Sequence, residues 1–343
     1  MKVIELDKKW KDAWNEIAKG PKGSFLQSYE WGEFKEVSGH KVWRFAITQT
    51  ELRSSDLTSS FKILAIASVV KEEVPYLGSY LYVPHGPIFN TEDKEKVMVL
   101  LQKELENLAQ KEEAMFVRFE PKNSLDFSEN LTHYKSSIQA IYTLKVNLSP
   151  ELDDIMNSFK KDTRYSIRTA QKRGVSIEIG EERDVAKFYE LLKETASRAS
   201  FEIYDFDYYK NLYQTLKKYN LVELLLAKYQ GKIVGGAMAI FFGDEVTYSH
   251  SAADPEKRDL AVAYPILWEI IKIAKERGCK KLDLWGVAPE SEINHPWAGF
   301  THFKRGFAPR ESIHAYPGSY FMILKPFKFR LYLWQKVLRG RKI

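Results

Sequence analysis

The stretch LVELLLAKYQGKIVGGAMAIFFGDEVTYSHSAAD, residues 221–254, contains three apolar runs separated by two short polar turns. Each turn (residues 230–232 and 243–245) holds a glycine, the residue that tight hairpin turns favour. The runs between the turns are too short for a bundle of helices and are bounded by these turn signals. The stretch therefore predicts three antiparallel strands in succession.

A helix and a fourth strand are predicted directly after these three strands, and two more helices before them. Residues 261–278 have apolar side chains at helical spacing, and KKLDLWGV (280–287) has the pattern of a strand. Upstream, residues 149–174 are predicted to form one continuous helix and residues 184–199 another, with the strand VSIEIG (175–180) between them. The second half is therefore expected to be a mixed α/β domain.

The first half of the chain shows the same mixture. An amphipathic helix in residues 7–21 can be capped by Asp7. A longer helix in residues 91–113 is predicted to turn one apolar face inward (Val97, Leu101, Leu105, Leu108). Strands are predicted at residues 42–48, 62–70, 80–89, 115–121 and 142–148. We therefore expect two α/β domains, with a boundary near residue 148.

Composition excludes several classes of protein. The chain has 343 residues, more than one domain of usual size, and 44% of them are hydrophobic. Its apolar runs are far shorter than the roughly 20 residues that span a membrane, and its charged N-terminus is unlike a signal peptide, so we expect a cytoplasmic protein. A single cysteine, Cys279, and scattered histidines argue against disulfides and metal sites. We expect neither a metal nor a cofactor. The net charge of +6 mildly favours polyanionic partners.

The predicted order of elements in the second half resembles that of acyltransferases of the GNAT type. In such folds two neighbouring strands part and expose backbone groups to an acyl donor. Members that use acetyl-CoA have a glycine-rich loop after the third strand, whose bare N–H groups bind the pyrophosphate. Here that loop reads RDLAVA (258–263), with alanines in place of the glycines and three acidic residues in or beside it (Asp254, Glu256, Asp259). These features argue against coenzyme A as the donor.

Several segments together resemble the Fem family, the tRNA-dependent aminoacyl transferases that build peptidoglycan cross-bridges. The segments occur in the family's order: SFLQSYEWGEFK (24–35), KKDTRYSIRTAQKRGV (160–175), YSHSAAD (248–254), LDLWGV (282–287), HFKRGF (302–307) and YPGSY (316–320). The resemblance implies two tandem GNAT-like domains. They would comprise residues 1–147 with 318–343 on the acceptor side and residues 148–317 on the donor side. It also implies an armless member, since no long charged heptad run interrupts the second domain.

The segment THFKRGF (301–307) is the predicted centre of catalysis. Two cations, Lys304 and Arg305, lie between Phe303 and Phe307, and Gly306 is expected to bend the backbone beside them. The resemblance matches Lys304 with the family lysine that faces the ester carbonyl, where negative charge develops. Phe303 matches the preceding aromatic residue, and we expect both phenylalanines to limit water around the amine. The alternative is a surface lysine beside two core phenylalanines.

Further site residues follow from the same resemblance. Glu120, or Asp283 on the predicted strand LDLWG, could orient or deprotonate the attacking amine, although structural roles are also open. Lys35 matches a lysine that contacts the acceptor's diphosphate, with a solvated helix position as the alternative. Three tyrosines (Tyr204, Tyr208, Tyr248) are further candidates for acceptor contact. Tyr204 stands where the family has an arginine, and tyrosine cannot form the bidentate pair with phosphate.

Two basic segments are candidates for polyanion binding. Four cations recur every four residues and are expected to share one helix face that contacts the phosphates of tRNA (Lys160, Arg164, Arg168, Lys172). The alternative is an ordinary solvated face. The C-terminus, KPFKFRLYLWQKVLRGRKI (325–343), could lie on an anionic membrane at its inner face. The alternative there is a closing helix packed on the first domain.

The predicted function is transfer of an amino acid from aminoacyl-tRNA to the stem-peptide amine of UDP-MurNAc-pentapeptide or lipid II by a monomeric protein. Two other functions stay open at this point. One is a GNAT N-acyltransferase that uses acyl-CoA, against which the RDLAVA loop argues. The other is a non-catalytic binder of tRNA or cell-wall precursor, which the tyrosine at position 204 leaves possible.

Overall fold

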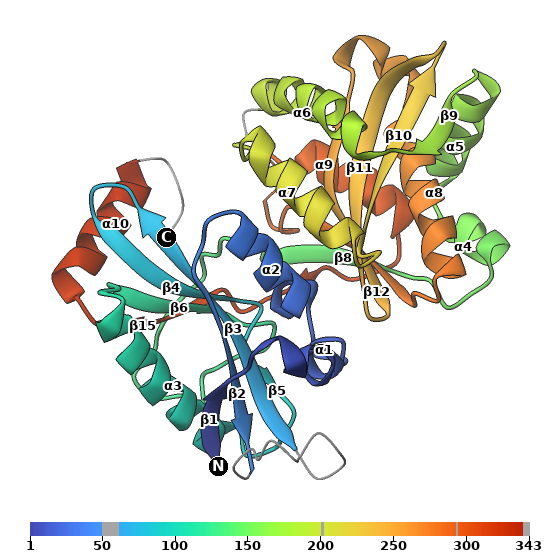
Figure 1. The fold of residues 1–343 in the computed structure, drawn as a ribbon. Coiled ribbons are helices and arrows are strands. Elements are labelled where there is room, and N and C mark those ends of the chain that lie inside the picture. The colour runs from blue at the N-terminus through green and yellow to red at the C-terminus, as the bar shows by residue number, and fades with distance from the viewer. Residues whose placement is uncertain (50–61, 200–201, 293, 339–343) are drawn as a thin grey trace. The chain divides into compact units, whose positions relative to one another are not determined.

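The computed structural model describes residues 1–49, 62–199, 202–292 and 294–338. The chain divides into two compact units (Figure 1): unit 1 comprises Met1–Ile141 with Tyr316–Ile343, and unit 2 comprises Tyr142–Ala315. The first boundary therefore lies at residue 141 and not at 147. The reason is that the strand Tyr142–Asn147 pairs with strands of unit 2, at Leu282–Val146 and at His314–Thr143.

Unit 1 is a mixed sheet with helices around it. Its strands are β1 (Lys2–Glu5), β2 (Val42–Thr48), β3 (Ile63–Val74), β4 (Gly78–Pro84), β5 (Ile88–Phe89), β6 (Phe116–Glu120), β7 (Thr132–Tyr134) and β15 (Ser319–Ile323). Its helices are α1 (Lys11–Ala18), α2 (Tyr29–Val37), α3 (Lys94–Lys111) and α10 (Pro326–Leu338). Asp7 caps the 3-10 turn that leads into α1, and the four predicted apolar positions of α3 are buried, as the sequence pattern indicates.

Unit 2 repeats the combination. Its strands are β8 (Tyr142–Asn147), β9 (Ser176–Ile179), β10 (Val222–Tyr229), β11 (Lys232–Phe242), β12 (Glu245–Ala253), β13 (Lys281–Gly286) and β14 (His314–Ala315). Its helices are α4 (Leu152–Ser158), α5 (Lys161–Lys172), α6 (Val185–Ala199), α7 (Phe206–Lys217), α8 (Ala263–Glu276) and α9 (Ala298–Phe307). The three antiparallel strands predicted from residues 221–254 are β10, β11 and β12.

The two sheets share one strand order over their first five positions. Unit 1 runs β1-β2-β3-β4-β6-β15-β7, and unit 2 runs β9-β10-β11-β12-β13-β8-β14. In each sheet one central pair is parallel, β4 with β6 and β12 with β13, while the neighbouring strands on both sides pair antiparallel. The position that β8 occupies in unit 2 is filled in unit 1 by β15, which the chain supplies only after unit 2 is complete.

The continuous helix predicted over residues 149–174 is wrong, because the structure breaks it at Phe159. The backbone of Phe159 is extended (ψ 157°), and its side chain is buried between the rings of Trp268 and Phe307. Arg164 from α5 donates to the carbonyl oxygens of Asn157 and Phe159, which satisfies acceptors at the end of α4. Burial of one large aromatic ring thus outweighs the helical propensity of the segment.

Candidate active site

Lys304 lies at the start of the last four residues of α9, and its amine is directed back at strand β13. The Nζ atom donates a hydrogen bond of 2.7 Å to the carbonyl oxygen of Gly286, the last residue of β13. Loss of solvent around the amine lowers the pKa of Lys304 to about 8, and the negative charge of Asp283 opposes that shift. The side chain is therefore still mainly an ammonium at neutral pH, with two further N–H donors.

Close packing of α9 on α5 places this amine, and Gly306 makes the packing possible. A Cβ atom at Gly306 would lie 2.2 Å from the Oγ1 atom of Thr163. The carbonyl of Gly306 also accepts a hydrogen bond of 2.9 Å from the backbone N–H of Lys160. Gly306 is helical and does not bend the chain, so the expectation of a bend is wrong. Its lack of a side chain serves helix-to-helix contact.

The end of β13 carries a buried carboxylate, Asp283, which is 1% exposed. It accepts hydrogen bonds from the hydroxyl of Thr143 and from the backbone N–H of Trp285 at 2.8 Å, and Lys145 Nζ lies 3.4 Å away. Between Asp283 and Gly286 the register with β8 shifts, and Trp285 adopts φ 60°. This bulge directs the Gly286 carbonyl toward α9.

Strands β12 and β13 part immediately beyond Asp283. Their parallel pairing ends at Thr247–Asp283, although β12 continues to Ala253 and β13 to Gly286. Among the described residues, the following part of β12 pairs only with β11, and a register shift occurs there between Met238 and Ala239. Such a parting leaves backbone donors and acceptors of both strands available to a ligand.

Aromatic side chains surround this parting of the strands. The ring of Phe303 lies 4.9 Å from that of Tyr264 and 5.4 Å from that of Phe307. Tyr248, the first residue of β12 beyond its pairing with β13, is 6.5 Å from Phe303 and 4% exposed. Burial raises the pKa of Tyr248 to about 12, so the hydroxyl is neutral and can donate. Lys304, Phe303 and Tyr248 thus belong to one region of unit 2.

Tyr204 and Tyr208 form a second aromatic feature at the start of α7. Their rings stack at 3.8 Å with an interplanar angle of 12°, and Asp205 caps the helix by accepting from the N–H of Tyr208. The ring of His250 of β12, a residue not predicted as part of the site, lies 6.2 Å from that of Tyr208. Burial lowers the pKa of His250 to about 4, so this ring is neutral at physiological pH. The sequence contains a signal for it, because His250 lies two residues after the candidate Tyr248 on the same predicted strand.

The two candidates in unit 1 are both paired within that unit. Lys35 Nζ lies 2.9 Å from Glu72, so its charge is matched there. Glu120 is 2% exposed and forms an ion pair of 2.7 Å with Arg118. It also accepts hydrogen bonds from three further side chains or backbone groups at 3.0 Å or less (Tyr82, Ile138, Gln139). This network gives Glu120 a structural role. The contacts of Lys35 and Glu120 with the acceptor stay predictions.

The predicted basic stripe is only partly directed at solvent. Lys160, directly before α5, and Arg168 and Lys172 on it are exposed, whereas Arg164 folds back onto the end of α4. Tyr165 lies among these cations with 68% of its surface exposed. An exposed aromatic ring beside exposed cations is a combination that nucleic-acid surfaces use.

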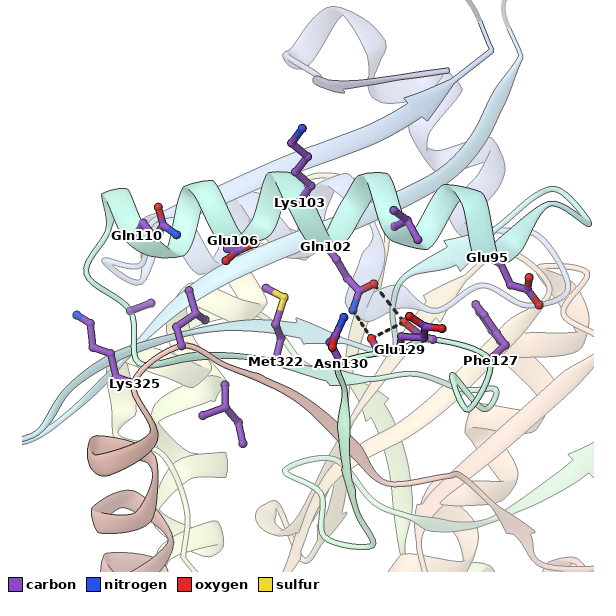
Figure 2. Close-up of a pocket in the computed structure, with 15 residues that line it drawn as sticks. Glu95, Gln102, Lys103, Glu106, Gln110, Phe127, Glu129, Asn130, Met322 and Lys325 are labelled. Atoms are coloured by element: carbon purple, nitrogen blue, oxygen red, sulfur yellow. Dashed lines mark hydrogen bonds between the residues drawn. The ribbon is translucent and has the colours of Figure 1, made fainter.

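A groove of about 860 Å³ lies in unit 1 between α3 and the segment of residues 127–130 (Figure 2). Gln102 reaches across it, donating to the carbonyl of Glu129 at 3.0 Å and accepting from Ser128 at 3.2 Å. None of the predicted site residues lines this groove. We therefore place the candidate active site at the parting of β12 and β13.

Two sheets that share the order of five strands, each with a central parallel pair, define a tandem acyltransferase-like fold. Comparison with solved structures agrees: the crystal structure of FemX superposes with a TM-score of 0.80 at 20% identity, over 96% of this chain and 99% of FemX. A tandem GNAT protein from the clavulanic acid biosynthesis pathway gives 0.54 at 10% identity. The model of the FemAB family matches residues 12–131, 125–233 and 220–336. The chain belongs to the FemAB family.

Relatives of established name are found in Staphylococcus aureus. The lipid II:glycine glycyltransferase of strain MRSA252 is 26% identical over 374 residues, which cover 84% of this chain and 86% of the relative. The protein of the same name in strain NCTC 8325 is 26% identical over 370 residues, covering 83% and 85%. These relatives are transferases, and the likeness extends through both units.

Proposed function

We propose that this protein transfers an amino acid from aminoacyl-tRNA to the stem-peptide amine of a peptidoglycan precursor, with lipid II as the acceptor. The name of the staphylococcal relatives supports a lipid II acceptor and glycine as the first amino acid to test. The observation that carries the proposal is the Lys304 amine, held at the end of β13 where the strands part and with its pKa lowered to about 8.

The chemistry requires a cation at this place. A neutral amine of the acceptor attacks the ester carbonyl carbon, and the carbonyl oxygen becomes negatively charged. The attack forms the C–N bond. Collapse of the intermediate restores the carbonyl and breaks the ester bond, and the departing ribose oxygen takes up the proton that the amine loses. Lys304 keeps one hydrogen bond to Gly286 and can direct another N–H at the oxyanion. One such donor contributes about 3 kcal/mol to stabilising the transition state.

The surroundings of Lys304 have matching roles in this proposal. Phe303 and Phe307 limit water, which strengthens the attraction between ammonium and oxyanion. Asp283 keeps the amine protonated near neutral pH, because its charge raises the pKa that desolvation lowers. The stacked Tyr204–Tyr208 pair and Tyr248 supply hydroxyl groups for the acceptor. Lys160, Arg168 and Lys172 are the proposed contacts with tRNA phosphates, and Lys35 with the acceptor's diphosphate.

The test is to incubate the protein with glycyl-tRNA and either lipid II or UDP-MurNAc-pentapeptide, and to follow the mass of the acceptor. We expect one or more glycine additions to lipid II, and loss of the reaction in Lys304→Ala. Arg305→Ala is the matched control, because Arg305 follows in the same helix and pairs with Glu290 on the surface. Acyl-CoA consumption in place of glycyl-tRNA would overturn the proposal, and so would binding of both substrates without turnover.

A further inference from the structure

The C-terminal helix α10 presents an apolar stripe to solvent. Phe327, Leu331, Trp334 and Leu338 are spaced by four, three and four residues and therefore share one helix face. Their exposed fractions are 74%, 37%, 63% and 65%, and the neighbouring Val337 is 54% exposed. Single exposed apolar residues are common, but a continuous row along a whole helix is a feature of binding surfaces.

The opposite face of α10 is firmly anchored in unit 1, so the stripe is held outward. The ring of Phe329 lies 5.2 Å from those of Phe116 and Phe321, and Tyr332 lies 4.8 Å from Phe116. The hydroxyl of Tyr332 accepts a hydrogen bond of 3.1 Å from Arg118. The closing helix expected as an alternative is therefore present, but its outer face is apolar as well as basic.

Cations flank this stripe and acidic residues are absent from it. The described helix and the residue before it contain four basic residues and no Asp or Glu (Lys325, Lys328, Arg330, Lys336). At 100° per residue, Lys328 and Arg330 project on either side of the Phe327–Leu331–Trp334 row. Both are exposed. A surface with an apolar centre and a positively charged margin is complementary to a partner that offers an apolar region bordered by negative charges.

We propose that the exposed face of α10 docks on the surface of a bilayer that contains anionic phospholipids. Phe327, Leu331 and Trp334 would enter the boundary between headgroups and acyl chains, where tryptophan is favoured, while Lys328 and Arg330 meet the headgroup phosphates. A second copy of the chain is a poor partner for this face, because two α10 helices would bring like charges together. Among the described residues no helix is long and apolar enough to cross a bilayer.

Docking of this kind lies beyond the proposed reaction and does not depend on it. It concerns unit 1 alone, and a catalytically inactive Lys304→Ala protein should bind the same vesicles. The two proposals can therefore fail separately, since one is tested by turnover and the other by sedimentation.

The experiment is co-sedimentation of the full chain with vesicles of phosphatidylcholine alone or of phosphatidylcholine with phosphatidylglycerol. We expect binding to the second kind, weakened by added salt. Leu331→Gln with Trp334→Gln should lower the partition coefficient at least tenfold, because both lose apolar burial in the interface. Lys328→Glu and Arg330→Glu should each lower it about fivefold or more. Lys328 and Arg330 are exposed, so thermal melts of their single variants should stay unchanged. The double variant should remain folded with a small loss of stability, because Leu331 is only 37% exposed.

Matched controls lie on α3 of the same unit. Val99 is 64% exposed and Lys103 is exposed, so Val99→Gln and Lys103→Glu make the same chemical changes away from α10. Both should bind vesicles like the unmodified chain. Three results would overturn the proposal: no sedimentation with phosphatidylglycerol vesicles, equal losses in the α3 controls, or a dimer in solution that the Leu331→Gln, Trp334→Gln variant dissociates.

Discussion

Each unit has a buried carboxylate at the last residue pair of the central parallel strands of its sheet, but the two carboxylates have different partners. In unit 1 the parallel pair β4–β6 ends at Pro84–Glu120, and in unit 2 the pair β12–β13 ends at Thr247–Asp283. Glu120 is paired directly with the guanidinium of Arg118. Asp283 has Lys145 at 3.4 Å and acts on the Lys304 amine, whose pKa is about 8.

The difference fits the proposed function, in which the carboxylate of unit 1 stabilises the fold and that of unit 2 serves the reaction. Around Glu120 the partners complete the charge and hydrogen bonding of the carboxylate, which is the arrangement of a structural ion pair. Near Asp283 a lysine amine is desolvated and held close to its point of deprotonation. Strongly perturbed amines beside a gap between strands are features of functional sites. The predictions below test this contrast.

Removing the cation from the unit 1 pair should have the largest effect. Arg118→Met leaves the Glu120 charge buried without its partner, and we expect a loss of about 3–5 kcal/mol in the free energy of unfolding. Urea unfolding followed by circular dichroism measures it. Lys41→Met is the matched control, because its ion pair with Glu112 is exposed on the lysine side and should be worth at most about 1 kcal/mol. Equal losses of stability in both variants would show that the buried Arg118–Glu120 pair has no special structural role.

Removing the cation from the unit 2 site should cost activity and not stability. For Lys304→Met we expect kcat to fall about 10²–10³-fold, the effect of losing one oxyanion donor. The melting temperature at pH 7 should stay the same or rise, because the pKa of Lys304 is lower in the folded chain than the ordinary 10.5.

The pH dependence of this variant follows from the same shift. The folded-state pKa of Lys304 is about 8 and the ordinary value is 10.5, so the unfolded chain binds the proton more tightly. The destabilising contribution of Lys304 is complete below pH 8 and shrinks as the pH rises from 8 toward 10.5. The difference in melting temperature between Lys304→Met and the unmodified chain should shrink over that range. A variant that is less stable at pH 7 and keeps its activity would contradict both expectations.

Packing of α9 on α5 should matter to a smaller degree. Gly306→Ala puts a Cβ atom 2.2 Å from Thr163 Oγ1, and we expect a loss of about 1–3 kcal/mol in stability together with lower kcat. Replacing Thr163 by alanine in the same chain removes that oxygen and should recover part of both. Thermal melts and initial rates of the single and double variants form a complete cycle. Full additivity of the two changes would show that this contact does not position the amine.

Neutralising Asp283 should have the smallest effect, seen as a shift in the pH profile. Asp283→Asn keeps an acceptor for Trp285 but removes the charge that raises the pKa of Lys304. The fall of kcat on the alkaline side should then move below pH 8, and a fall of about one pKa unit lowers activity at pH 8 about fivefold. Glu120→Gln is the control and should leave this limb in place. An unchanged pH profile for Asp283→Asn would show that the charge of Asp283 does not set the pKa of Lys304.

Sequence reasoning predicted the repeated α/β organisation because it rests on local signals. Hairpin glycines and apolar periodicity locate β10, β11, β12 and α3, and these depend on neighbouring residues only. The segment of residues 149–174 has the local pattern of one helix, but the structure breaks it at Phe159. The break depends on contacts of Phe159 with Trp268 and Phe307, which lie more than a hundred positions away in the sequence. Local propensity carries no information about such a contact.

The candidate site divides along the same line. The residues of HFKRGF single out Lys304 and its aromatic neighbours by type and by family resemblance, so the sequence by itself determined the candidate amine and the class of fold that holds it. Only the tertiary structure decided that Gly286 and Asp283 meet this amine, that Gly306 serves contact with Thr163, and that α10 turns its apolar row outward. The physical reason is that desolvation, close packing and exposure depend on atoms that distant segments bring together.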